Sequence, residues 1–211
     1  MSNTTILKKP DANIVTGFLK RATELLDRDY RPQSKESAKV STTPIGDTLA
    51  PTPEPVLLRG QYDLYTDGSG SIMGPYGWAW ILVDSAGNEV VRGDGYDADG
   101  TSNVAELRAV LEGLKAVVAM DGDYTVNIKS DSAYVVNCFT QGWHENWAAN
   151  GWRTSTNRPV KNISIWQQLI PLAVGINATF EHVPGHRGIK YNEECDKMAG
   201  AARRRGSGCR I

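Results

Sequence analysis

An excess of charge of either sign is missing from this sequence. Its 211 residues include 23 lysines and arginines and 24 aspartates and glutamates, which give a formal net charge of −1. A chain without a basic excess has no overall positive field that would attract nucleic acid. Any contact with nucleic acid must therefore come from side chains that gather locally.

Cysteines and long apolar runs are also scarce. The cysteines are odd in number and lack the spacing of metal ligands, so they indicate reduced thiols: Cys138, Cys195 and Cys209. No apolar run is long enough to cross a membrane, and the N-terminus lacks the apolar core of a signal peptide. The sequence therefore predicts a soluble, cytoplasmic protein.

The composition allows one ordinary domain with flanking segments, because 40% of the residues are hydrophobic. Residues 32–58 are rich in proline, serine and threonine, which predicts a flexible linker. It would join an N-terminal extension, residues 1–31, to a domain at 59–205 with a C-terminal tail at 206–211. Apolar residues at helical spacing predict one short amphipathic helix in the extension. Since such a helix is unstable alone in water, we expect it to bind a partner, to pack on its own domain or to remain partly disordered.

Within the domain, strand and helix patterns alternate. The stretches YDLYTD, WAWILVD and EVVRGDGY predict three strands of an antiparallel meander. They are followed by a helix at 103–120, a strand at TVNIKSD, a short helix through Tyr134, a helix at 163–174, a strand at ATFEHV and a last helix from about Asn192 to Arg205. This order predicts an α/β fold with a five-stranded mixed sheet, an antiparallel meander plus parallel strands, and helices on both faces.

Two aspartates fall at the ends of predicted strands. Asp67 ends the first strand and Asp131 ends the fourth. A crossover helix can place these two strands side by side and parallel, so that both carboxylates lie at one edge of the sheet. Carboxylates that close repel each other unless a cation intervenes. The structural alternatives are a tight turn at Asp67 and a helix cap at Asp131.

Three further residues can join this edge. Glu106 shares the helix face of the apolar stripe, where a charge is costly unless it is paired or coordinated. The alternative is a capping box from Asn103 to Glu106. His186 lies in a glycine-flanked loop, and Asp196 follows in the expected first turn of the last helix, where an acid also complements the helix dipole.

Taken together, these motifs resemble the type 1 ribonuclease H family. They are YTDGSG at Asp67, SNVAELRAV at Glu106, KSDSAYVVN at Asp131 and PGHRGIKYNEECDKMA, which holds His186 and Asp196. The intervening WHENWAANGWRTSTNRPVKNISIWQQL resembles the helical handle of the bacterial enzymes. The resemblance runs unbroken over roughly residues 61–203 and implies a ribonuclease H-like fold.

The resemblance implies an endonuclease that hydrolyses the RNA strand of RNA–DNA hybrids and leaves 5′-phosphate and 3′-hydroxyl ends. It implies that His186 assists proton movement or product release, and that four acids bind metal and are catalytic: Asp67, Glu106, Asp131 and Asp196. Hard oxygen ligands select Mg²⁺ or Mn²⁺. Two such ions about 3.5–4 Å apart can activate water and stabilise the leaving 3′ oxygen.

Contacts with the hybrid follow from the same resemblance. Asn103 matches a family residue near the cut, and the backbone of Gly68 and Ser69 can approach RNA 2′-hydroxyls. The handle supplies aromatic and basic candidates, although its tryptophans can equally pack between helices: Trp143, Trp147, Trp152 and Lys161. The handle is only weakly basic, which predicts weaker and more salt-sensitive binding.

Two other functions share part of this pattern. A non-catalytic hybrid-binding module would keep the fold and lose part of the acid set. Another nuclease on the same fold, such as an integrase or a junction resolvase, would lack the handle and the PGHRG loop. Since the acids, the loop and the handle are all present, the sequence favours ribonuclease H. We expect a monomer that binds the RNA–DNA hybrid and does not associate with membranes. Binding of a partner protein is one role that we expect for the N-terminal helix.

Overall fold

The computed structural model describes residues 58–208, so the expected N-terminal helix and residues 32–57 of the expected linker lie outside the described residues. Leu58, predicted as the last linker residue, is instead the first residue of β1. In chain order the elements are β1 (Leu58–Ser69), β2 (Gly74–Asp84), β3 (Glu89–Gly100), α2 (Ser102–Val118), β4 (Gly122–Ser130), α3 (Ala133–Thr140), α4 (Trp143–Ala149), α5 (Ile163–Gly175), β5 (Thr179–His182) and α6 (Lys190–Gly208).

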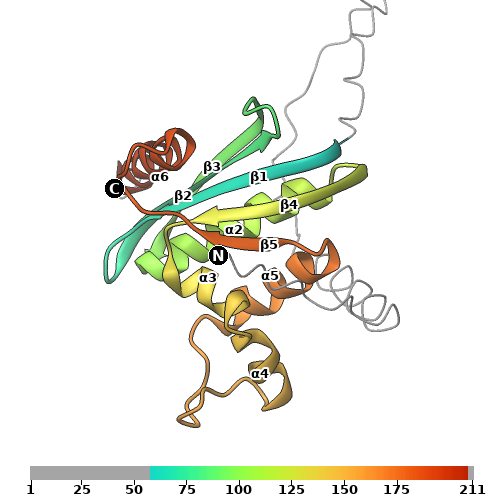
Figure 1. The fold of residues 1–211 in the computed structure, drawn as a ribbon. Helices are drawn as coiled ribbons and strands as arrows, with labels where there is room; N and C mark the ends of the chain where they lie inside the picture. The colour runs from blue at the N-terminus through green and yellow to red at the C-terminus, as the bar shows by residue number, and fades with distance from the viewer. Residues whose placement is uncertain (1–57, 209–211) are drawn as a thin grey trace, which may run out of the picture.

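The five strands form one mixed sheet in the order β3-β2-β1-β4-β5 (Figure 1). β1 pairs with β2 and β2 with β3 in the antiparallel sense, whereas β1 pairs with β4 and β4 with β5 in the parallel sense. The helix α2 makes the crossover from β3 to β4, as the sequence predicts. The predicted five-stranded mixed sheet is therefore confirmed.

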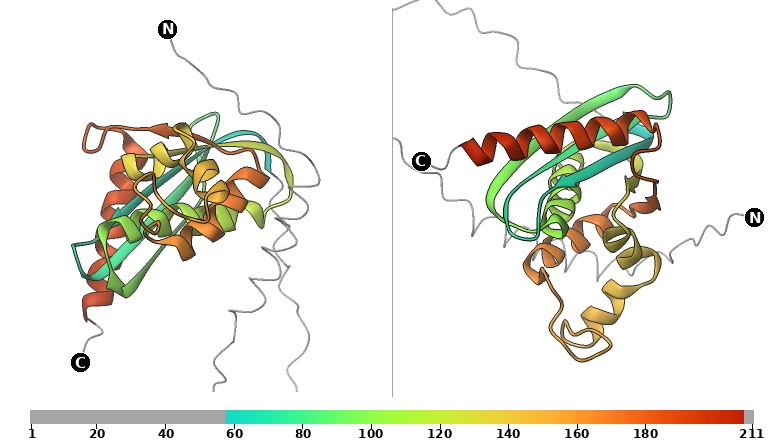
Figure 2. Two further views of the ribbon diagram at one scale, coloured as in Figure 1. Left: turned by 90° about the horizontal axis from the view of Figure 1, so that it is seen from below. Right: turned by 90° about the vertical axis from the view of Figure 1, so that its left-hand side faces the viewer.

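Helices cover both faces of this sheet (Figure 2). α6 packs on β1, β2 and β3, while α2 packs on the opposite face of β1 and β2 and is itself covered by α5. The larger hydrophobic core lies on the α2 side and includes Leu64, Leu111 and Ile128. The smaller core lies under α6, where Ala79 and Ile81 of β2 contact it. Alternate residues of each strand thus enter different cores, as the period of two requires.

α4 and the loop that follows it project away from the sheet (Figure 1). Aromatic side chains pack α4 and this loop against the rest of the domain. Trp147 is only 8% exposed and meets Trp166 of α5 edge to face, with ring centroids 5.5 Å apart. Trp143 and Trp152 flank Trp147 at centroid distances of 6.1 and 6.5 Å. The packing role that the sequence left open for these tryptophans is therefore present.

Several element ends differ from the sequence-based expectations. α6 begins at Lys190 rather than near Asn192, and it ends at Gly208 rather than at Arg205. Asp196 consequently lies in the second turn of α6, so its expected place in the first turn was wrong. β5 is four residues long, shorter than the ATFEHV pattern. Within residues 58–208, no helix combines the length and the apolar character that crossing a membrane requires.

Candidate active site

The parallel pairing of β1 and β4 brings two acids together. Thr66 pairs with Ser130, so Asp67, the next residue of β1, and Asp131, which directly follows the last residue of β4, lie side by side at the carboxyl edge. β1 continues to Ser69, so Asp67 lies within paired strand and not in a tight turn. Asp131 does not cap α3 either, because Ser132 holds the cap position. Both structural alternatives for these aspartates were wrong.

Glu106 reaches the same edge because the start of α2 lies against the end of β1. A Cβ atom on Gly68 would come within 2.3 Å of the Glu106 backbone nitrogen, so only glycine permits this approach. The cap of α2 is Thr101, whose hydroxyl accepts a hydrogen bond from the Val104 backbone at 3.3 Å. The alternative of a capping box from Asn103 to Glu106 was therefore wrong, and the carboxylate of Glu106 is left for the acid cluster.

Three carboxylates form a compact cluster. One oxygen each from Asp67, Glu106 and Asp131 lies within 4.8 Å of the others. Burial, followed by the charges of Asp131 and Asp196, raises the pKa of Asp67 to about 7. Burial, followed by the charges of Asp67 and Asp131, also raises the pKa of Glu106 well above its usual range.

The cluster has the properties of a divalent-cation site. Its members are all hard oxygen donors, and no positive side chain is among them. Glu106 Oε2 is buried without a hydrogen-bond partner among the described residues. Buried anionic oxygens that lack donors are costly, and a bound cation removes both that cost and the mutual repulsion. The residues present therefore fit a divalent metal ion.

Asp196 and His186 lie at the border of this cluster. Asp196 is not one of the three clustered acids, but its charge acts on both Asp67 and Glu106. His186 Nδ1 lies 3.9 Å from Asp196 Oδ2, and the histidine side chain is 81% exposed. The backbone of His186 is left-handed, with φ of 52°. The histidine is thus solvent-accessible and next to the acids, as the sequence predicts.

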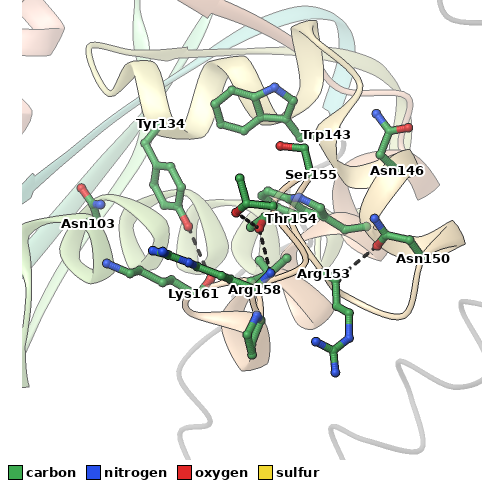
Figure 3. A pocket seen from close by; sticks show the side chains of 14 residues that line it. Asn103, Tyr134, Trp143, Asn146, Asn150, Arg153, Thr154, Ser155, Arg158 and Lys161 are labelled. Atoms are coloured by element: carbon green, nitrogen blue, oxygen red, sulfur yellow. Dashed lines mark hydrogen bonds between the residues drawn. The ribbon is translucent and has the colours of Figure 1, made fainter.

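A cavity of about 760 Å³ lies along the handle and reaches the start of α2 at Asn103 (Figure 3). Asn103 lies at one end, three residues before Glu106, which is about 4.5 Å along the helix axis. Figure 3 shows Tyr134 and Trp143 on one side of this cavity and Arg158 and Lys161 on another. Four predicted contact residues line it, namely Asn103, Trp143, Trp147 and Lys161, whereas Gly68, Ser69 and Trp152 do not.

Several residues of this cavity were not predicted as contacts from the sequence. Tyr134, Asn146 and Asn150 also line it. The spacing of Trp143, Asn146 and Asn150 is that of one helical face, which could have indicated them. Tyr134 follows Asp131 by three residues, and its hydroxyl accepts a hydrogen bond from Trp166 Nε1 at 2.9 Å. That bond orients the phenol ring between the core and the cavity.

Fold and site together define a sheet with an acidic cation-binding edge beside a polar and aromatic groove. The model of one family, RNase H, matches residues 59–204. The chain therefore belongs to the RNase H family, the endonucleases that hydrolyse the RNA strand of RNA–DNA hybrids.

Curated relatives agree with this assignment. The chain is 39% identical over 137 residues to the ribonuclease H of Chlorobaculum parvum. This match covers 64% of the present chain and 90% of the relative. It is 41% identical over 141 residues to the ribonuclease H of Oleidesulfovibrio alaskensis, which covers 66% and 88% of the two chains.

Solved structures show the same fold. One is LC9-RNase H1, described as a type 1 RNase H with the type 2 active-site motif, which matches with a TM-score of 0.60 at 24% identity. The match covers 74% of the present chain and 76% of LC9-RNase H1. A foamy viral protease-reverse transcriptase in complex with double-stranded DNA has a TM-score of 0.58 at 24% identity, and covers 67% of this chain and 93% of its own.

Proposed function

We propose that this RNase H family member hydrolyses the RNA strand of hybrids with Asp67, Glu106, Asp131 and Asp196 as Mg²⁺ ligands. The observation that carries the proposal is the set of three carboxylate oxygens within 4.8 Å of one another at the carboxyl edge of two parallel strands. Open α/β sheets place their sites at this edge. Few carboxylates and a hard cation suit Mg²⁺, with Mn²⁺ as its substitute.

When bound, two divalent ions supply an activated water and stabilise the charge on the leaving 3′ oxygen. The side chains hold the site together. Asp67 and Asp131 are fixed by the paired strands, and Glu106 by the close approach of α2 to β1. Products with 5′-phosphate and 3′-hydroxyl ends follow from attack by water.

The cavity beside the handle is our candidate for the groove that receives the hybrid. Arg158 and Lys161 place positive charge there, and Trp143 offers a ring face for sugars or bases. Asn103 connects this groove to the acid edge, and the backbone of Gly68 and Ser69 is our candidate for the 2′-hydroxyl contact. The basic residues that line the cavity are Arg153, Arg158 and Lys161, and so small a number supports the expected weak binding of the hybrid.

The test of this function is a panel of labelled substrates incubated with the protein and Mg²⁺. The panel contains an RNA–DNA hybrid, double-stranded RNA, double-stranded DNA and a four-way junction. We expect cleavage of the RNA in the hybrid and of nothing else. Cleavage of the junction instead would indicate a resolvase, and binding of the hybrid without cleavage would indicate a non-catalytic module.

We propose that His186 moves a proton or assists product release, because its exposed ring lies beside Asp196. His186→Ala is then expected to lower kcat by about 10²–10⁴-fold, the usual contribution of general acid–base help. KM for the hybrid should stay nearly unchanged, and residual activity should remain. Steady-state kinetics at fixed Mg²⁺ measure both constants.

Arg187→Ala is the matched control for His186→Ala, since Arg187 is the exposed neighbour on the same loop. It should keep kcat near that of the unchanged protein. If His186→Ala were as inactive as a variant without one of the acids, the subsidiary role of His186 would be wrong.

A domain boundary just before Leu58, one residue earlier than the start predicted from the sequence, is part of the proposal. Leu58 is 1% exposed and its backbone N–H donates to Asp121 O at 2.8 Å, so β1 is tied into the domain from its first residue. A chain that begins at residue 55 should therefore fold and cleave the hybrid at a rate similar to that of the full chain. Insoluble or inactive protein would show that the boundary is wrong.

Location and assembly complete the proposal. Cys138 and Cys195 are buried free thiols, which agrees with a cytoplasmic location. That the protein is a monomer, and that its N-terminal helix binds a partner protein, are predictions from the sequence.

A further inference from the structure

Asn192 lies in the first turn of α6 and faces the acid cluster. It is 2% exposed, and its Nδ2 donates to Asp131 Oδ2 at 3.5 Å, a long hydrogen bond to a charged acceptor. Only the NH₂ side of an amide can face a carboxylate favourably, so this contact fixes the orientation of the Asn192 amide.

The other end of the Asn192 side chain is unsatisfied. Its Oδ1 is buried without a hydrogen-bond partner among the described residues. A buried carbonyl oxygen without a donor lowers stability, and an apolar side chain of similar size would avoid that cost. Such a cost in a native structure calls for an explanation. Among the described residues, the side-chain hydrogen bond of Asn192 is with Asp131.

Gly185 approaches the same carboxylate oxygen from the loop that precedes α6. A Cβ atom on this residue would lie 2.7 Å from Asp131 Oδ2. The backbone of Gly185 does not have a positive φ, so its conformation does not require glycine. The space that the Asp131 carboxylate occupies is therefore the reason for a glycine at this position.

The segment that carries these contacts is itself anchored at both ends. The Val183 backbone donates to Ser130 O at 3.1 Å, and the Gly188 backbone donates to Glu193 Oε1 at 2.8 Å. His182 Nε2 lies 3.0 Å from the Asp131 carbonyl oxygen. Val183 and His182 therefore hold the start of this segment against the end of β4, beside Asp131.

We propose that Asn192 and Gly185 are positioning residues that hold the Asp131 carboxylate in the orientation in which it joins Asp67 and Glu106. The amide binds Oδ2 and the glycine leaves room for it, so the carboxylate cannot rotate away from the cluster. The inference rests on the proposed function, since it takes Asp131 as a metal ligand. Partners that orient a ligand commonly change metal affinity by 10–100-fold when they are removed.

The test is calorimetric titration of the full chain with Mn²⁺, without nucleic acid. Asn192→Leu, which keeps the branched shape of the side chain and removes the donor, should weaken Mn²⁺ binding by about 10–100-fold. Its melting temperature without metal should be unchanged or higher, because the unsatisfied Oδ1 is gone. KM for the hybrid should be nearly unchanged, while the Mn²⁺ concentration for half-maximal rate rises. A purely structural asparagine would give the opposite result, lower stability with unchanged Mn²⁺ affinity.

Thr66→Val is the matched control. Thr66 is fully buried next to Asp67, and its hydroxyl also lacks a partner among the described residues. Its replacement removes an orphaned oxygen without touching Asp131, so Mn²⁺ affinity should not change. In an Asp131→Asn background, Asn192→Leu should cause no further loss of Mn²⁺ affinity. A full additional loss there would overturn the proposal.

Gly185→Ala provides a second, independent variant, should Asn192→Leu fail to fold. The added methyl group displaces Asp131 Oδ2 and should also weaken Mn²⁺ binding. Unchanged affinity in a folded variant of either residue would overturn its positioning role. If the unchanged protein neither bound Mn²⁺ nor cleaved the hybrid, the proposed function would fail. If the unchanged protein bound Mn²⁺ and cleaved the hybrid, and the folded Asn192 and Gly185 variants bound Mn²⁺ as tightly as it does, only the positioning role would be wrong.

Discussion

Asp67→Asn is expected to abolish hydrolysis of the hybrid and to stabilise the metal-free protein above pH 7. The first effect follows because an amide cannot replace a carboxylate as a charged ligand of Mg²⁺. The second follows from the pKa of Asp67, which burial and then the charges of Asp131 and Asp196 raise from 3.8 to about 7.

The sign of the pH dependence is determined by this raised pKa. Well below the unfolded-state pKa of 3.8, the carboxyl group is protonated in the folded and unfolded chains, so its burial causes no pH-dependent loss of stability. As the pH rises to 7 the unfolded chain ionises more readily, and the folded protein loses stability. At about 1.4 kcal/mol per pKa unit, the loss reaches on the order of 4 kcal/mol. Thermal unfolding with EDTA should show a higher melting temperature for Asp67→Asn at pH 8 and little difference at pH 4.

Asp63→Asn is the control for this prediction. Asp63 lies on the same face of β1, but it pairs with Lys129 at 3.1 Å and is not one of the three clustered acids. It should keep its activity and gain no stability. Full activity of Asp67→Asn in Mg²⁺ would show that Asp67 is not a ligand.

Gly77→Ala is expected to destabilise the protein by about 2–3 kcal/mol, in the upper range of overpacking substitutions. A Cβ atom at this position would lie 2.3 Å from Ala199 O and 2.4 Å from Arg203 N, both in the backbone of α6. A backbone cannot rotate away as a side chain can, so α6 must move off β2. Because α6 carries Asp196, cleavage activity should fall as well. Urea unfolding and hybrid cleavage measure the two effects.

Gly200→Ala in α6 is the matched control for Gly77→Ala. The nearest atom to its added Cβ would be the flexible end of Arg204, at 3.5 Å. Alanine in a helix interior is favoured over glycine by about 0.5–1 kcal/mol, so this variant should be as stable or more stable. An equal loss of stability in both glycine variants would show that the contact of α6 with β2 is not the cause.

The sequence was sufficient to predict the sheet and the acid edge, because these depend on local patterns. The alternation of β1 and the helical period of α2 each bury one face, and the crossover rule then makes β1 and β4 parallel. Asp67 and Asp131 follow directly from that pairing. The burial of Glu106 followed from its register with the apolar stripe.

Other features depend on how distant segments meet, and the sequence could not supply them. Whether Thr101 or Asn103 caps α2 depends on the direction in which the chain leaves β3. The start of α6 at Lys190 depends on the loop around Asp131, where Glu193 accepts the Gly188 backbone N–H. The contacts of Gly185 and Asn192 with Asp131 join residues 54 and 61 positions apart in sequence, and no local pattern indicates them.

The most direct test of the account is the Mg²⁺ dependence of single-turnover cleavage of a hybrid labelled on both strands, with analysis of the product ends. The account predicts RNA fragments with 5′-phosphate and 3′-hydroxyl ends, intact DNA, no cleavage in EDTA and none by Asp67→Asn. Cleavage that persists in EDTA, or fragments with 2′,3′-cyclic phosphate ends, would contradict it, because such ends require attack by the RNA 2′-hydroxyl instead of by water.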